Sequence, residues 1–177
     1  MLKHRGSQAA TSVLPVVKDI IDQVRQDGDA ALKRLTAAFD GHTNVTIPRR
    51  DITTARKKVP HDVYEALVYA HRRIVAFHQR QLQTSWLMTG HYGEILGQMV
   101  RPLDRVGIYV PGGKAVYPSS VLMNALPARV AGVREIVMVT PGGPKGIDPT
   151  ILAAADLCGI EKVFQIGGAQ AIAALAY

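Results

Sequence analysis

The sequence contains three pairs of adjacent glycines whose backbone amides could bind a ligand. The pairs are Gly112-Gly113, Gly142-Gly143 and Gly167-Gly168, and each comes after a short apolar run (106–110, 136–140 and 163–166), the first two after an intervening proline. Glycine at such a turn lets backbone amides approach a phosphate or a ring closely, and a helix that follows favours an anion. None of the turns has the Gly-x-Gly-x-x-Gly spacing, so ligand contact and tight strand-to-helix connections both stay open.

The side chains that usually carry catalysis give weaker signals. His71 and His78 share a helix face only at i, i+7, which separates them by about 10 Å along the helix axis, too far for two ligands of one metal ion. Cys158 lies near the end of an apolar stretch, with no basic neighbour expected to lower its pKa, which favours a small core residue. Asp156 and Glu161 form a pair of carboxylates, but their positions near a helix end suit ordinary solvation. No catalytic set emerges from these residues.

The sequence also gives no sign of a serine nucleophile. No serine occupies a Gly-x-Ser-x-Gly elbow, and Ser119-Ser120 are predicted to cap the start of a helix.

Basic residues are concentrated in the first half of the chain. Lys and Arg number 14 against 8 Asp and Glu up to residue 80, and 7 against 6 afterwards, which gives the net charge of +7. The densest group consists of Arg49, Arg50, Arg56, Lys57 and Lys58. Such a group can contact nucleic acid or an acidic partner. The alternative is the solvated face of a short helix, because Ile52, Ala55 and Val59 mark an opposite apolar face and no aromatic residue is interleaved for base stacking.

Helical periodicity dominates the first eighty residues. Apolar residues recur at helical spacing and glycine or proline stands at the expected ends. The expected elements are a helix over 13–28, a helix over 31–41, a short helical segment over 51–59, a long helix over 60–81 and a small hairpin within 85–102. The first helix is expected to bury Val13 and Val16, the second Phe39 and the long one Phe77.

The remainder predicts an α/β fold. Apolar runs without polar alternation suit strands buried on both faces, and helices over 119–130 and 148–157 suit crossovers between parallel strands. Pro127 is expected to disturb the first of these helices. The fold class is therefore an amino-terminal helical region with a hairpin, followed by a three-strand parallel βαβαβα unit that is partly Rossmann-like. The expected domains are 1–102 and 103–177.

Composition excludes several classes of protein. The 177 residues are 47% hydrophobic and 20% charged, and the mean hydropathy is +0.07. These values suit a globular protein, and no apolar run approaches the roughly 18 residues of a membrane span. One cysteine rules out an internal disulfide, and no secretory signal is evident at the start. We expect a cytoplasmic protein.

Long stretches of the sequence resemble histidinol dehydrogenase. The resemblance rests on RVGIYVPGGKAVYPSSVLMNALPARVAGVREIVMVTPGG (105–143) and ILAAADLCGIEKVFQIGGAQAIAALAY (151–177), supported by VRQDGDAAL, the Phe39-Asp40-Gly41 triplet and IVAFHQRQ. It covers nearly the whole chain. It implies an oxidoreductase of histidine biosynthesis, an NAD-dependent and zinc-containing homodimer that oxidises L-histidinol through L-histidinal to L-histidine, with no nucleic-acid or membrane partner.

The resemblance also assigns residues. By motif match, the tyrosine of VGIYVPGG and the glutamine of GGAQAI contact NAD, and these are Tyr109 and Gln170. They are expected to face one crevice. The family's zinc ligands and its acid/base pair belong to sequence after the GGAQAI helix, so no catalytic and no metal-binding residue is assigned in this chain.

The last residues of the sequence are apolar and helical in pattern. Residues 169–177 form an apolar helical stretch without a stop signal, so we expect this chain to be the amino-terminal part of a longer enzyme. Its final helix, with Ala171, Ile172, Ala174 and Leu175, is then expected to lack the elements that would normally cover it. This part alone is expected to be inactive and to bind no stoichiometric zinc. The alternatives are a non-catalytic binding or scaffold protein of the same fold, or one half of a split enzyme.

Overall fold

A three-stranded parallel sheet forms the centre of the molecule. The computed structural model describes residues 7–112, 115–143 and 146–177, with side chains from residue 13 onward. The strands are β3 (Arg105–Tyr109), β4 (Glu135–Thr140) and β5 (Lys162–Gln165), in the order β3-β4-β5. Register pairs Ile108 with Met138 and Met138 with Val163. The predicted α/β class with its three parallel strands is therefore confirmed.

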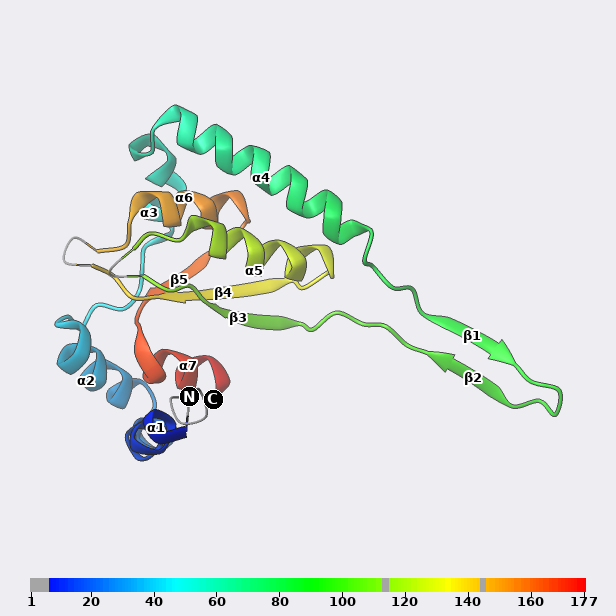
Figure 1. Ribbon diagram of the computed structural model, residues 1–177, viewed down its shortest axis with the longest axis horizontal. Helices are drawn as coiled ribbons and strands as arrows, with labels where there is room; N and C mark the ends of the chain where they lie inside the picture. Colours follow the sequence, from blue (N-terminus) through cyan, green and yellow to red (C-terminus); the bar gives the residue numbers. More distant parts are fainter. Residues whose placement is uncertain (1–6, 113–114, 144–145) are drawn as a thin grey trace, which may run out of the picture.

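Two helices that connect the strands cover one face of this sheet. They are α5 (Pro118–Val130) and α6 (Pro149–Leu157), and Figure 1 shows both on the same side. The apolar residues of α6 are buried around most of its circumference, including Ala153, Ala154 and Ala155. A helix that is apolar all round must be enclosed. The enclosure comes from α3 (Arg49–Thr54) and the 3-10 helix η1 (Ala55–Lys58), which pack on its outer side.

The amino-terminal helices pack against both faces of this sheet assembly. The long helix α4 (His61–Gln79) lies on α5, whereas α1 (Ser7–Asp27) and α2 (Asp29–Asp40) contact α7 (Gly168–Ala176) on the opposite face (Figure 1). Residues 45–47 also pair with β5 in antiparallel fashion, through a bridge between Thr46 and Phe164. One apolar core contains Ile52 and Leu67 together with sheet residues. The division at residue 102 stays a prediction.

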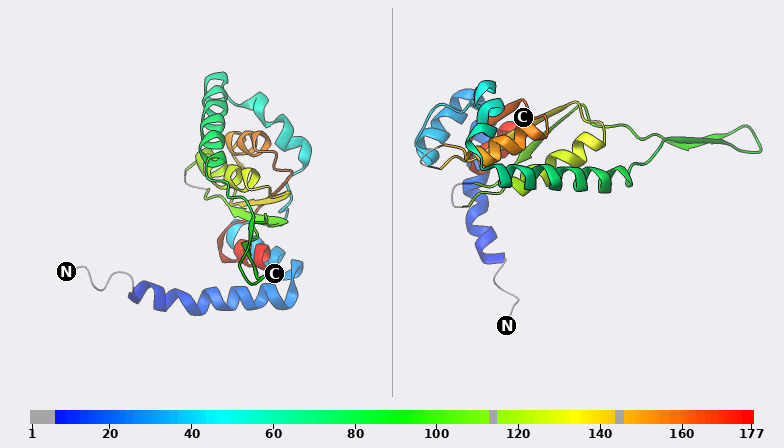
Figure 2. Two further views of the ribbon diagram at one scale, coloured as in Figure 1. Left: turned by 90° about the vertical axis from the view of Figure 1, so that its right-hand side faces the viewer. Right: turned by 90° about the horizontal axis from the view of Figure 1, so that it is seen from above.

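The predicted hairpin is present and projects from the body. Its strands are β1 (Trp86–Thr89) and β2 (Ile95–Gln98), and both are exposed on their two faces. Figures 1 and 2 show the hairpin beyond the end of α4, and Figure 2 shows α1 reaching outward on another side. The Ser85 hydroxyl accepts a hydrogen bond from the Val100 amide at 2.8 Å and ties the base of the hairpin together.

Several local expectations are wrong. Val13, Val16, Phe39 and Phe77 were expected in the core but are exposed, because the outer ends of their helices extend past the elements they pack on. In α1 the burial begins at Ile20, where the helix meets α7.

The start and course of α5 also differ from expectation. The helix begins at Pro118 with Tyr117 as its N-cap and no side-chain cap, so Ser119 and Ser120 lie inside the first turn. Proline suits that first position because its fixed φ matches the helix and its missing N–H would be unpaired there anyway. Pro127 does not interrupt the helix. The carbonyl that loses its donor is that of Met123, on the exposed face, where water can replace it.

The final helix has more cover than expected. Ala171 and Ala173 are buried, and the guanidinium of Arg25 in α1 lies 4.8 Å from the ring centroid of Tyr177. Among the four residues expected to lack cover, Ile172 is the one classed as an exposed large apolar side chain. Among the described residues, no helix is both long enough and apolar enough to cross a membrane.

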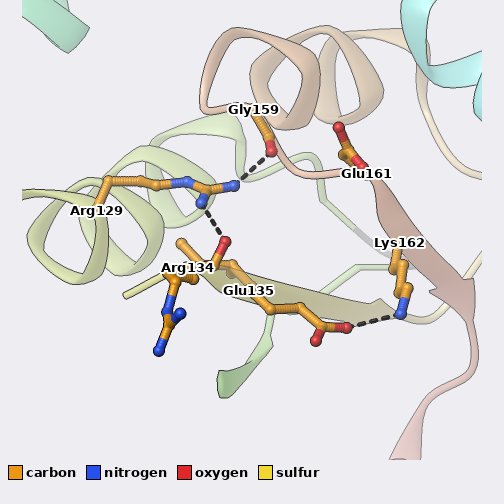
Figure 3. Close-up of a pocket in the computed structure, with 7 residues that line it drawn as sticks. Arg129, Arg134, Glu135, Gly159, Glu161 and Lys162 are labelled. Carbon is orange, nitrogen blue, oxygen red and sulfur yellow. Dashed lines mark hydrogen bonds and ion pairs between the residues drawn. The ribbon is translucent and has the colours of Figure 1, made fainter. Parts of the chain in front are cut away.

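Arg129, near the end of α5, locks the amino-terminal edge of the sheet. Its guanidinium donates to the carbonyl oxygens of Arg134 at 2.8 Å, Cys158 at 3.2 Å, Val133 at 3.3 Å and Gly159 (Figure 3). These carbonyls belong to the two turns that lead into β4 and β5. One side chain therefore satisfies acceptors in two connections that are far apart in the sequence.

Replacing Arg129 by methionine should lower the free energy of unfolding by about 2 kcal/mol, since partly buried carbonyl groups lose their donor while the aliphatic volume is kept. Urea unfolding followed by circular dichroism measures this. Arg105→Met is the matched control, because Arg105 makes an exposed ion pair that contributes less than about 1 kcal/mol. An equal loss in both variants would contradict the role of Arg129.

Candidate functional site

The carboxyl ends of the three strands lie together at one edge of the sheet. The strands end at Tyr109, Thr140 and Gln165, and each leads into one of the glycine turns. Ligands of open parallel sheets bind at this edge, since the strand-to-helix connections there leave a crevice. The two side chains that the resemblance assigns, Tyr109 and Gln170, both lie at this edge.

The glycines let the three turns pack on one another. A Cβ on Gly112 would lie 2.6 Å from the carbonyl oxygen of Pro141, and one on Gly167 would lie 2.8 Å from the Cβ of Pro141. Pro141 is therefore wedged between the turns that follow β3 and β5. This supports the interpretation of these two glycines as tight connections, and Gly113 lies outside the described residues.

Tyr109, the last residue of β3, reaches across to the start of α7. Its hydroxyl oxygen accepts a hydrogen bond from the backbone N–H of Gly168 at 3.3 Å, and the ring is half-buried. Gly168 has φ +64°, a backbone conformation that glycine adopts without strain. The hydroxyl proton of Tyr109 is not used in this bond and stays available to a further acceptor.

Gln170 lies two residues further along α7, and its side chain folds back over Gly168. Its side chain is only 1% exposed, and a Cβ on Gly168 would lie 2.6 Å from its Oε1 atom. The two residues that the resemblance assigns to NAD thus meet at Gly168. Their contact with a cofactor stays a prediction.

A second polar pair at this edge escaped the sequence analysis. The Nε2 atoms of Gln165 and His42 are 3.2 Å apart, although 123 positions separate the two residues in the chain. The Gln165 backbone N–H also donates to the carbonyl oxygen of Val45 at 2.6 Å. Nothing in the local sequence signals this pairing, because His42 follows a helix end and looks like any solvent-exposed histidine.

The opposite edge of the sheet holds a charged cavity of about 340 Å³. It is lined by Arg129, Arg134, Glu135, Ile136, Gly159, Glu161 and Lys162 (Figure 3). Apart from Arg129, which binds carbonyl groups, the charged side chains there pair with one another or with close neighbours.

Glu135 is the centre of this pairing. Lys162 and Arg105 each contact its carboxylate at 2.7 Å, and hydrogen bonds from Lys162 first and Arg105 second hold the pKa of Glu135 below its ordinary value. Arg134 pairs with Asp104 at 2.9 Å. Most of these charged side chains are therefore paired, although Glu135 meets two cations and the Arg129 guanidinium meets only carbonyl oxygens, so a net positive charge remains at this cavity.

The basic group of the first half surrounds α3 and η1. Ile52, Ala55 and Val59 are buried as the apolar face of this segment, whereas Arg49 pairs with Glu161 and the Arg56 guanidinium lies 4.3 Å from the ring centroid of Tyr64. These positions support the interpretation of a solvated helix face.

Comparison with known proteins gives one consistent answer. The family model of histidinol dehydrogenase matches residues 3–177. The histidinol dehydrogenase of Neisseria gonorrhoeae is 53% identical over 169 residues, and that of Syntrophotalea carbinolica is 50% identical over 177 residues. This chain belongs to the histidinol dehydrogenase family.

Solved structures agree with the sequence comparison. The crystal structure of histidinol dehydrogenase from Elizabethkingia anophelis matches with a TM-score of 0.84 at 33% identity and covers 92% of this chain. The matched region is only 38% of that chain, and this chain covers 39% of the Neisseria gonorrhoeae protein and 41% of the Syntrophotalea carbinolica protein. It therefore spans about two fifths of the length of its relatives and matches their amino-terminal part.

Zinc, which the family resemblance implies, finds no ligand set in the described part of the chain. No group of three or more His, Cys, Asp or Glu side chains comes together there. His78 instead lies with Nδ1 2.6 Å from the Oε1 atom of Gln81, and burial followed by the charge of Arg72 lowers the pKa of His71. The described residues do not fit a zinc ion, and no chemical step is assigned to one here.

Cys158 is buried, in agreement with the prediction of a core residue. Burial raises the pKa of its thiol to about 12, and the nearby charge of Arg129 opposes this only in part. The expectation that no basic residue lies near it is wrong, because Arg129 comes from another helix and its Nε donates to the Cys158 carbonyl.

Cys158 should therefore react with a disulfide reagent at about pH 8 only as fast as the chain opens, since the thiolate is the nucleophile and is almost absent below the raised pKa. The release of the coloured thiol measures the rate. Labelling should become fast in denaturing urea, which serves as the control. Equally fast labelling of the native chain would show that the thiol is accessible.

Proposed function

We propose that this chain builds part of the NAD site of a histidinol dehydrogenase, an enzyme that oxidises L-histidinol through L-histidinal to L-histidine. The observation that carries the proposal is the meeting of Tyr109 and Gln170 at Gly168, on the carboxyl edge of the parallel sheet. The chemistry of these groups fits a dinucleotide. A phenol, a primary amide and the first turn of a helix together supply donors, an acceptor and a positive dipole end.

In this proposal NAD accepts the hydrides, and the chain's own residues bind and orient it. The backbone N–H of Gly168 polarises the Tyr109 hydroxyl by donating to its oxygen, which strengthens the O–H as a donor to a ribose or phosphate oxygen. The Tyr109 ring offers a flat apolar surface beside that donor. Gln170 is buried against Gly168, and in this proposal its amide contacts the cofactor where the first turn of α7 meets it.

The remaining features are proposed on the family's account. They are zinc bound outside the described residues, a homodimer, a cytoplasmic location, and no role for nucleic acid or a membrane. The paired and apolar surroundings of the basic group support the absence of a nucleic-acid partner.

Tyr109→Phe should raise the dissociation constant for NAD about fivefold, because one hydrogen bond of about 1 kcal/mol is lost while the ring surface remains. Isothermal titration calorimetry with the 177-residue chain measures this. Tyr92→Phe is the matched control, since Tyr92 lies at the hairpin tip and is 92% exposed. If the unaltered chain fails to bind NAD, or both variants bind equally well, Tyr109 has no role in the cofactor site.

The chain by itself should form no NADH from histidinol and NAD, with or without added zinc, because its described residues provide no group of metal ligands and the family's acid/base pair is expected in sequence after the GGAQAI helix. Absorbance of NADH in a purified sample tests this. Turnover that follows the chain through gel filtration would show that it carries its own catalytic groups.

A further inference from the structure

We propose that His42 is a positioning residue of the cofactor site, acting through Gln165 on the turn that follows β4. The inference rests on the proposed NAD site and adds a residue that none of the family motifs contains. His42 lies on the segment between α2 and α3, whereas Gln165 is the last residue of β5. The contact between them joins the amino-terminal helices to the carboxyl edge of the sheet.

Gln165 is held at two points by the segment that carries His42. Its backbone N–H donates to the Val45 carbonyl, and its side-chain amide meets the His42 ring. The neighbouring Ile47 N–H donates to the Val163 carbonyl at 3.0 Å, so the segment is bound to β5 on both sides of the bridge between Thr46 and Phe164. The amide of Gln165 is thus fixed in both position and direction.

The geometry determines where the His42 proton lies. With the Gln165 amide in this orientation its Nε2 donates and the Nε2 of His42 accepts, which corresponds to the tautomer with the proton on Nδ1. Among the described residues, no hydrogen-bond partner reaches this buried Nδ1 atom, and none reaches the buried Oδ2 atom of Asp40, two residues earlier. Within the described part of the chain, Gln165 is therefore the hydrogen-bond partner that sets the tautomer of the ring.

From Gln165 a series of direct contacts leads to Tyr109. The Gln165 amide lies against the α-carbon of Gly142, where a Cβ would overlap it, and its Oε1 is 3.7 Å from a Cβ placed on Gly146. The turn that begins with Gly142 forms a closed pair of hydrogen bonds between Gly143 and Gly146 at 2.9 and 3.0 Å. The amide therefore presses on one side of this turn.

The same turn sets the position of the tyrosine's partner. Pro141, next to Gly142, packs against Gly167, and the following Gly168 N–H donates to Tyr109. A displacement of the Gln165 amide is passed on to Pro141, then to Gly168 and Tyr109. Because tightly packed segments move together, loss of the His42 acceptor loosens the groups proposed to bind NAD.

Two variants of His42 separate the hydrogen bond from the bulk of the ring. His42→Phe keeps an aromatic ring but removes the acceptor, and we expect it to raise the dissociation constant for NAD fivefold to tenfold. His42→Gln places a carbonyl oxygen close to the original Nε2 position and should stay within twofold of the unaltered chain. His78→Phe, on the exposed end of α4, is the matched control and should have no effect.

A double-mutant cycle distinguishes positioning from general destabilisation. If His42 acts through Gly168 and Tyr109, the effect of His42→Phe on NAD affinity should shrink to less than twofold in a Tyr109→Phe background. A full and additive effect in that background would overturn the proposal. Nitrogen-15 spectra of the imidazole should show the proton on Nδ1, and a proton on Nε2 would also overturn it.

The outcomes separate the two proposals. If the unaltered chain binds no NAD, the proposed function fails and this inference fails with it. If the unaltered chain binds NAD and His42→Phe binds it equally well, with an unchanged thermal midpoint, the inference alone fails.

Discussion

The carboxyl edge of the sheet depends on the close packing of three turns. Parallel strands deliver all their carboxyl ends to the same place, so the connections must share a small volume. Pro141 fills the space between Gly112 and Gly167, and a side chain on either glycine would displace it. The arrangement of Tyr109 and Gln170 around Gly168 follows from this packing, because their common partner is held there by its neighbours.

At the opposite edge of the sheet, a charged side chain holds the turns together. There the turns that lead into β4 and β5 present carbonyl oxygens, and a single guanidinium from α5 satisfies them (Figure 3). The nearby ion pairs add little free energy each because they are exposed. The two edges therefore differ in chemistry: charged side chains satisfy carbonyl groups and one another at the amino-terminal edge, whereas the carboxyl edge keeps a phenolic donor available.

Local patterns predicted the elements well and their surroundings less well. The strands and crossover helices followed from apolar runs and glycine turns, because burial on both faces requires a sequence without polar alternation. Burial of Phe39 and Phe77 was mispredicted, since periodicity shows which face is apolar but not where the partner element ends. For the site, Tyr109 and Gln170 came from a motif, whereas His42 depends on contacts over more than a hundred residues that no local signal encodes.

The antiparallel bridge between residues 45–47 and β5 bears on how the chain folds. The two bridged residues, Thr46 and Phe164, are almost 120 positions apart in the sequence. Closing so large a loop is slow for entropic reasons, and contacts of long sequence separation lower folding rates. The helices and the hairpin can therefore form early. We expect the bridge between Thr46 and Phe164, and with it the contact of His42 with Gln165, to form among the last steps.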